Sequence, residues 1–231
     1  MDNNTIIYRV LSGRSNAYLI VADKLHILVD TGTKRAFPKL LKAYHSIPQS
    51  KQIFDYLILT HTHYDHCQNA SKLKKIYNCK VITSLKEKHF AENGLLTLPS
   101  GTNRVTKLIV RIGKKLPLKL FSFKPFNPDI LVENEYVFKE HGLNIRIVET
   151  PGHSPGSVCV IVDDSVAIVG DTLFGVFPNS VFPPFADNPK TLVQSWVRLL
   201  DTRCQLFLPG HGGEIKRALL EKALNARMNF F

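Results

Sequence analysis

The sequence has little of what marks a secreted or membrane-spanning chain. No apolar run approaches the roughly 20 residues that span a bilayer. The first residues, Met-Asp-Asn-Asn-Thr, lack the basic start and apolar core of a secretory signal. The cysteines are scattered without a Cys-x-x-Cys pair, which favours reduced, packed thiols. From these absences we expect a cytoplasmic protein with no membrane partner.

Acidic residues are scarce beside basic ones. The 19 Asp and Glu residues face 30 Lys and Arg residues, so the formal net charge is +11. This charge predicts attraction to anions without naming them. Internal repeats and low-complexity segments are also missing. With 231 residues, 44% of them hydrophobic, the chain can build one sizeable core, and we predict a single domain over residues 1–231.

Short β-prone runs alternate with helical segments in two halves, and each half ends in a polar loop. This alternation predicts an α/β fold of layered type. One expected helix follows a Ser84-x-x-Glu87 pattern that has the form of a capping box. The expected strands cover residues 6–10, 17–21, 25–29, 56–59, 80–83, 143–148, 158–162, 166–169 and 205–208. The expected helices cover residues 36–45, 70–77, 84–92, 188–199 and 214–227.

Residues 94–128 depart from this alternation. They are rich in Gly, Pro and Lys, show no clean period, and are expected to form an inserted flap. The flap's basic residues would form a solvated face, attract a small anionic substrate, or contact phosphates. Between Gly101 and Lys124 there are seven basic residues and no acidic one: Arg104, Lys107, Arg111, Lys114, Lys115, Lys119 and Lys124.

Histidines and aspartates gather directly after predicted strands. Three histidines and one aspartate fall within six residues, after the apolar run that stops at Thr60. Two further histidines and one aspartate each follow a later strand, where strand ends present side chains to a common cleft. Imidazole and carboxylate groups suit zinc, and also iron or manganese. The predicted metal ligands are His61, His63, Asp65, His66, His153, Asp171 and His211.

This His-x-His-x-Asp-His loop with later His, Asp and His residues resembles the metallo-β-lactamase superfamily. The resemblance runs from the Leu28–Gly32 segment to His211. It implies a four-layer αβ/βα sandwich with the site at one edge. It also implies two divalent metal ions, with zinc as the first choice. The implied ligands are His61, His63 and His153 for the first ion, Asp65, His66 and His211 for the second, and Asp171 between them.

Two ions roughly 3.5–4 Å apart would bind a bridging water and lower its pKa, so that a hydroxide attacks an electrophile. The segments around Asp171 and His153 resemble glyoxalase II-type thioester hydrolases. We therefore predict a metal-dependent hydrolase of a thioester, ester or lactone, acting on an anionic small molecule. Asp65 would also handle a proton. Asp30 either orients a ligand or is a plain turn residue at a strand end.

Three other functions stay open on sequence alone. The iron-dependent persulfide dioxygenases share much of the scaffold but keep one metal ion. A phosphodiesterase or nuclease of the same superfamily would use the basic stretch to bind nucleic acid, although no RNA-binding module accompanies it. A metal-dependent binding protein would keep the ligands without catalysis. The sequence identifies no substrate-binding residue and no oligomeric state.

Overall fold

The computed structural model describes residues 5–22, 25–48, 53–95, 98–113, 115, 122–138 and 142–228. Strands among these residues form two six-stranded sheets. The first has the order β1 (Ile6–Leu11), β2 (Ala17–Ala22), β3 (Leu25–Val29), β4 (Tyr56–Ile58), β5 (Lys80–Ser84) and β6 (Ile130–Val132). The second has the order β12 (Ile215–Lys216), β11 (Leu206–Pro209), β10 (Val166–Gly170), β9 (Val158–Val162), β8 (Ile145–Glu149) and β7 (Glu135–Val137).

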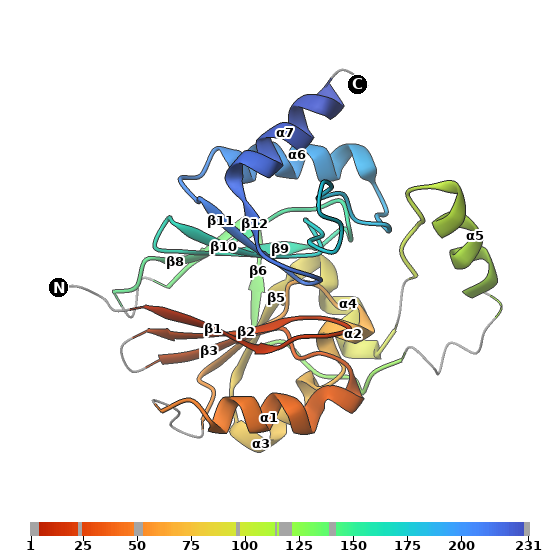
Figure 1. Cartoon of the computed structure of the whole chain (residues 1–231). Coiled ribbons are helices and arrows are strands. Elements are labelled where there is room, and N and C mark those ends of the chain that lie inside the picture. Colours follow the sequence, from red (N-terminus) through yellow and green to blue (C-terminus); the bar gives the residue numbers. More distant parts are fainter. Residues whose placement is uncertain are drawn as a thin grey trace.

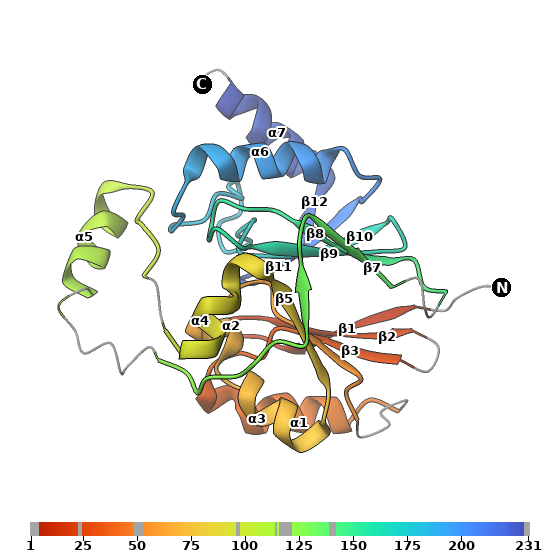
Figure 2. The same ribbon diagram turned by 180° about the vertical axis from the view of Figure 1, so that it is seen from behind.

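Helices cover the outer face of each sheet, as Figures 1 and 2 show from opposite sides. The first sheet carries α1 (Phe37–His45), which follows the 3-10 turn η1 (Lys34–Ala36), and α3 (Ala70–Tyr77). The second sheet carries α6 (Pro189–Leu200) and α7 (Arg217–Met228). The short elements α2 (Tyr64–Cys67), η2 (Leu85–Glu87) and α4 (Lys88–Asn93) lie at one end of the sandwich. The four-layer sandwich implied by the sequence is therefore confirmed.

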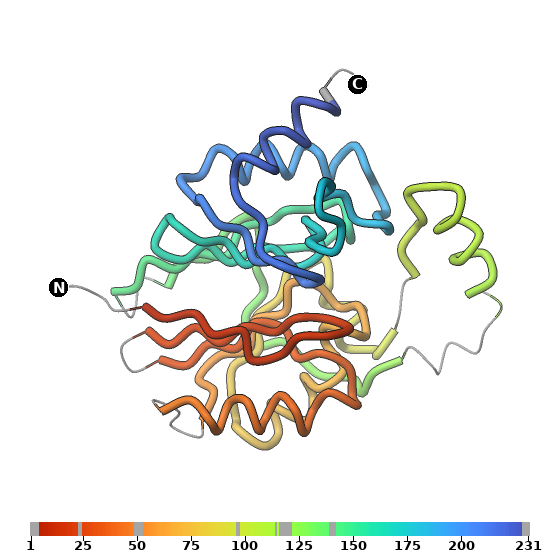
Figure 3. The backbone as a smooth tube through the Cα atoms, viewed as in Figure 1, coloured from red at the N-terminus to blue at the C-terminus, as the bar shows by residue number. Residues whose placement is uncertain are grey.

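Strand β2 explains how one sheet can be buried on both faces. All six of its residues are buried, and side chains of a strand alternate between the two faces. Leu19 and Val21 pack with the helices α1 and α3, whereas Ile20 packs with residues of the second sheet. A third buried cluster joins the second sheet to α6 through Trp196. Figure 3 shows that the first half of the chain builds one half of the sandwich and the second half builds the other.

The segment 94–128 contains a helix that its composition does not predict. Helix α5 (Arg104–Gly113) stands to one side of the sandwich in both Figures 1 and 2. By contrast, Phe123 and Phe126 are buried in the core between the first sheet and its helices. The excursion from the sandwich is therefore shorter than the expected flap. Lys114 and Lys119 lie outside the described residues.

No helix in the described part of the chain is both long and apolar enough to cross a bilayer. The cysteines Cys67, Cys79, Cys159 and Cys204 are all buried and unpaired with one another. Burial raises the pKa of the Cys159 thiol to about 12, so this thiol stays neutral. Their burial agrees with the expectation of packed thiols.

Candidate metal centre

The strands bring the predicted ligands to one edge of the sandwich. Parallel pairing of β3, β4 and β5 makes these strands end on the same side, and the His61–His66 loop follows β4. In the second sheet β8 and β10 both run antiparallel to β9, and β11 runs parallel to β10. The loops after β8, β10 and β11 therefore meet at one edge, and they carry His153, Asp171 and His211.

One cluster of possible ligand atoms comes from three buried histidines. His61, His63 and His153 each offer a ring nitrogen, and these three atoms lie within 4.8 Å of one another. The Nε2 atom of His153 lies 2.8 Å from the Nδ1 atom of His63. The Nδ1 atom of His153 donates to the carbonyl oxygen of Phe185 at 2.9 Å, which leaves Nε2 as the acceptor atom.

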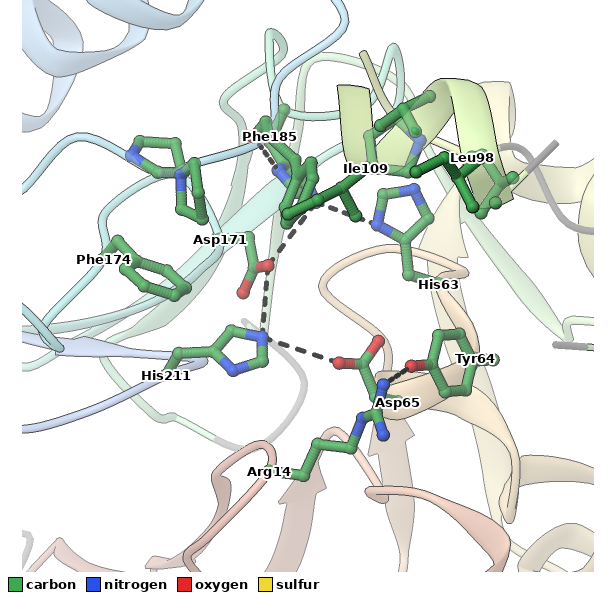
Figure 4. Close-up of a pocket in the computed structure, with 17 residues that line it drawn as sticks. Arg14, His63, Tyr64, Asp65, Leu98, Ile109, Asp171, Phe174, Phe185 and His211 are labelled. Atoms are coloured by element: carbon green, nitrogen blue, oxygen red, sulfur yellow. Dashed lines mark hydrogen bonds and ion pairs between the residues drawn. The ribbon is translucent and has the colours of Figure 1, made fainter. Parts of the chain in front are cut away.

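A second cluster lies beside the first. Asp65, His66 and His211 offer atoms within 4.8 Å of one another. The Nε2 atoms of His66 and His211 are 3.3 Å apart, and Nε2 of His211 is 3.7 Å from Oδ2 of Asp65. Asp171 links the clusters, because its Oδ2 lies 3.5 Å from His153 Nε2 and 3.3 Å from His211 Nε2. Figure 4 shows Asp171 beside His211.

The donor atoms at the centre suit a cation. Among the described residues, His61 Nε2, His63 Nε2 and Asp171 Oδ1 are buried and have no hydrogen-bond partner. Such atoms are rare in folded proteins and call for a partner such as an ion. Burial, together with the neighbouring histidines, lowers the pKa of His61 and of His63 well below the usual value. Both rings are then neutral at pH 7, the form that binds metal.

The carboxylates give the second cluster a negative field. Burial alone would lower the pKa of His66, but Asp171 and Asp30 outweigh it and raise the pKa to about 10. Burial would also lower the pKa of His211, but Asp171 outweighs this effect, so the pKa of His211 is raised as well. Burial alone would raise the pKa of Asp171, yet His211 and the other histidines hold it well below its usual range. This spot therefore favours positive charge, whether protonated imidazole or metal ion.

Asp30 lies behind the second cluster with its carboxylate fully engaged. Its Oδ1 accepts from Thr60 N at 2.9 Å, and its Oδ2 accepts from Thr60 Oγ1 at 2.8 Å. The Nδ1–H of His66 donates to Oδ2 at 2.8 Å. Thr60 Oγ1 is also 3.0 Å from His61 Nδ1. Asp30 therefore contacts one predicted ligand directly and another through Thr60, which is the arrangement that orients ligand rings.

Gly210, directly before His211, leaves room for two predicted ligands to lie against the backbone. A Cβ atom at this position would lie 2.4 Å from Oδ1 of Asp171 and 2.6 Å from Cε1 of His66. Every other residue type would therefore displace a predicted ligand. A hydrogen bond also holds this turn, because the backbone N–H of Asn16 donates to the Gly210 carbonyl oxygen at 2.7 Å.

Glu87 is a buried carboxylate that sequence reasoning assigned to a different role. Ser84 does cap η2 by accepting from Lys86 N, but Glu87 does not complete the capping box. Instead, its Oε2 accepts from both the backbone and the hydroxyl of Thr62, in the loop of His61 and His63. Its Oε1 accepts from the hydroxyl of Ser154 at 2.7 Å and from Gly156 N at 3.1 Å, beside His153. One side chain thus joins two ligand loops.

We expect Glu87→Gln to lower the free energy of unfolding by about 2–3 kcal/mol, because an amide group would face a hydrogen-bond donor in a buried place. Metal affinity should fall with it. Urea unfolding and metal titration measure both effects. Glu92→Gln is the matched control, since Glu92 lies on the following helix α4, is exposed, and has an ion pair with Lys88 at 3.8 Å. Equal stability of the two variants would contradict the role of Glu87.

A cavity of about 530 Å³ opens onto the centre. Its lining includes His63, Asp65, His153, Asp171 and His211. The remaining lining comes from residues that the sequence did not single out: Arg14, Tyr64, Leu98, Pro99, Ile109, Val110, Ile112, Gly113, Phe174, Pro183, Pro184 and Phe185. The centre is therefore reachable by a small molecule.

This geometry matches a known family. The family model of the metallo-beta-lactamase superfamily matches residues 12–211, so the chain belongs to that superfamily. A probable metallo-hydrolase of Methanocaldococcus jannaschii is 33% identical over 201 residues, which cover 86% of this chain and 87% of that protein. An atrochrysone carboxyl ACP thioesterase of Aspergillus fumigatus is 24% identical and aligns over 91% of this chain and 57% of its own length.

A solved structure with the same fold is TTHA1623 in a di-iron-bound form. Its TM-score is 0.65 at 24% identity, with 94% of this chain and 98% of that chain covered. These similarities place the chain in a superfamily of metallo-hydrolases, and its His and Asp clusters could hold metal. The roles of individual residues, the number and identity of the metal ions, and the glyoxalase II-like branch stay predictions.

Proposed function

We propose that this chain is a two-metal hydrolase that cleaves a thioester, ester or lactone, with zinc as its first-choice metal. The observation that carries the proposal is the position of Asp171. Its carboxylate lies within 3.5 Å of Nε2 of His153 in one cluster and within 3.3 Å of Nε2 of both His66 and His211 in the other. A carboxylate shared by two donor clusters supports two ions rather than one.

Bound metal ions would supply Lewis acidity and a water molecule activated for attack on an acyl carbonyl. The chain's own residues would hold and orient them. His61, His63 and His153 would hold one ion, and Asp65, His66 and His211 the other, with Asp171 between. Asp65 also lines the cavity and is partly exposed, so it would take the proton released by the attacking water and pass it to the leaving group.

One comparison supports acyl transfer to water as the reaction class. One relative is named as a carboxyl ACP thioesterase, and its similarity extends along most of this chain. Arg14, which lines the cavity, supports an anionic substrate. It donates to the Tyr64 hydroxyl, and its guanidinium carbon lies 5.1 Å from the centre of the Tyr64 ring. This cation would attract an anionic part of the substrate. A cytoplasmic setting belongs to the same proposal.

The test combines metal analysis with a substrate panel. We expect about two metal equivalents per chain in the purified protein and turnover of thioesters or lactones. A strong chelator should abolish turnover, and added zinc should restore it. Elemental analysis and a panel of thioesters, lactones and phosphodiesters measure these outcomes.

Each alternative function has its own result in that experiment. One iron per chain with oxygen uptake would favour the persulfide dioxygenase. Turnover confined to phosphodiesters would favour a nuclease. Full metal occupancy with no turnover of any substrate class would favour a binding protein.

A further inference from the structure

The cavity beside the metal centre has two chemically different ends. Arg14, Tyr64 and Asp65 lie at one end in Figure 4, whereas Leu98 and Ile109 lie at the other, near His63. The other apolar lining residues adjoin labelled ones along the chain: Pro99 follows Leu98, Val110 and Ile112 follow Ile109 on α5, and Pro183 and Pro184 precede Phe185. No charged side chain of the described residues lines that end. A polar or charged group placed there would lose its hydration without a partner.

Helix α5 exposes large aliphatic side chains that nothing in the described structure covers. Val105, Leu108, Ile109 and Ile112 have 53–68% of their surface exposed. Their spacing of three and four residues puts them on one stripe of the helix. Ile109 and Ile112 line the cavity, while Val105 and Leu108 do not. The stripe thus has an inner pair at the cavity and an outer pair away from it.

The basic residues of α5 do not face the cavity. Arg104, Lys107 and Arg111 are exposed and absent from its lining. One interpretation of the sequence was a lid whose basic side chains attract an anionic substrate. The position of these three side chains outside the cavity lining does not support that role. The helix instead presents aliphatic groups to the reaction site.

The start of α5 is hydrogen-bonded to the segment of Pro183 and Pro184, which also lines the cavity. Thr102 N donates to the Pro184 carbonyl oxygen at 3.0 Å, and Thr102 Oγ1 donates to that of Pro183 at 3.0 Å. Asn103 Oδ1 caps the helix by accepting from Thr106 N at 2.9 Å. The carbonyl oxygen of Phe185, the next residue of that segment, accepts from Nδ1 of His153. The aliphatic wall therefore has a defined position relative to the metal centre.

We propose that the apolar end of this cavity binds the acyl group of the substrate, an unbranched aliphatic chain, and that Ile109 and Ile112 determine specificity for its length. This inference rests on the proposed function. The cavity volume lies in the range of sites for small molecules, so it holds a chain of several methylenes beside the reacting carbonyl. The acyl chain covers the inner pair of aliphatic side chains, and the thiol or alcohol part lies toward Arg14.

The experiment compares acyl thioesters of N-acetylcysteamine from acetyl to decanoyl, with the metal-loaded full chain. We expect kcat/KM to rise about two- to fourfold for each added methylene until the cavity is full. Ile109→Asn with Ile112→Asn should reduce this rise to near onefold. Val105→Asn with Leu108→Asn is the matched control on the same helix, and it should keep the wild-type rise. Circular dichroism checks the helix in both variants.

A second measurement does not depend on turnover. Calorimetric binding of decanoate to the metal-loaded protein should weaken at least tenfold in the inner-pair variant and stay unchanged in the outer-pair variant. If no thioester is hydrolysed but decanoate binds in this pattern, the proposed function fails and the acyl site stands.

The opposite result is equally distinct. Thioester turnover with no dependence on chain length overturns the acyl site and leaves the hydrolase intact. Equal loss in the inner-pair and outer-pair variants also overturns it, because the helix would then act as a whole.

Discussion

Asp171→Asn should lower turnover by about 10³-fold or more and leave the protein with less than its full metal content. The estimate corresponds to losing several kcal/mol of charge stabilisation at the reacting centre. The amide keeps the shape of the side chain but removes the negative charge that three neighbouring histidines face. One amide nitrogen would also point a donor at a cation. Elemental analysis and thioester kinetics measure the two effects together.

The control for this variant is Asp201→Asn. Asp201 follows α6, is exposed, and lies outside the cavity lining. It should keep wild-type metal content and turnover. If Asp171→Asn also kept both, the carboxylate between the clusters would not hold metal, and the proposal of two linked ions would be lost.

The sequence predicts where the site lies, because it shows where each strand ends. The apolar run before Thr60 stops where polar ligands begin, and the same change occurs before Asp171. Whether two such loops meet depends on strand direction, which the sequence alone leaves undetermined. Here β8, β10 and β11 run the same way, so their loops converge. The structure supplies the strand directions, which the local pattern of residues does not contain.

Glu87 shows where local reasoning stops. Its position three residues after Ser84 fits a capping box, and a local hydrogen bond is the interpretation that spacing favours. The structure uses the side chain for partners 25 and 67 residues away, Thr62 and Ser154. Which buried donors a carboxylate meets depends on the packing of separate loops. No spacing rule along the chain contains that information.

Helix α5 was missed for a different reason. Its apolar positions do recur at helical spacing, but the flanking Gly, Pro and Lys residues hide this over a window as long as residues 94–128. An apolar stripe also predicts burial, and this stripe is exposed. The buried Phe123 and Phe126 show the converse, since core residues lie in a stretch whose composition indicated a surface flap.

Asp30→Asn should weaken metal binding by about 10–100-fold, the effect typical of removing a side chain that orients a metal ligand. The backbone of Asp30 has a φ of 61°, a conformation that asparagine tolerates. The fold should therefore persist. The hydrogen bond between Asp30 and His66 should change instead. The oxygen beside Thr60 N must stay an acceptor, so the new amide nitrogen replaces the oxygen that faces His66.

An amide donor beside His66 Nδ1 would move the ring proton to Nε2. That nitrogen lies 3.3 Å from both Asp171 and His211, in the second cluster, and once protonated it cannot bind a metal ion. Asp163→Asn is the matched control, because Asp163 also has a positive φ, of 50°, yet lies exposed in the turn after β9. Competition with a fluorescent zinc chelator measures both affinities. Equal affinities would make Asp30 a plain turn residue, since its carboxylate would then not govern which nitrogen of His66 is free.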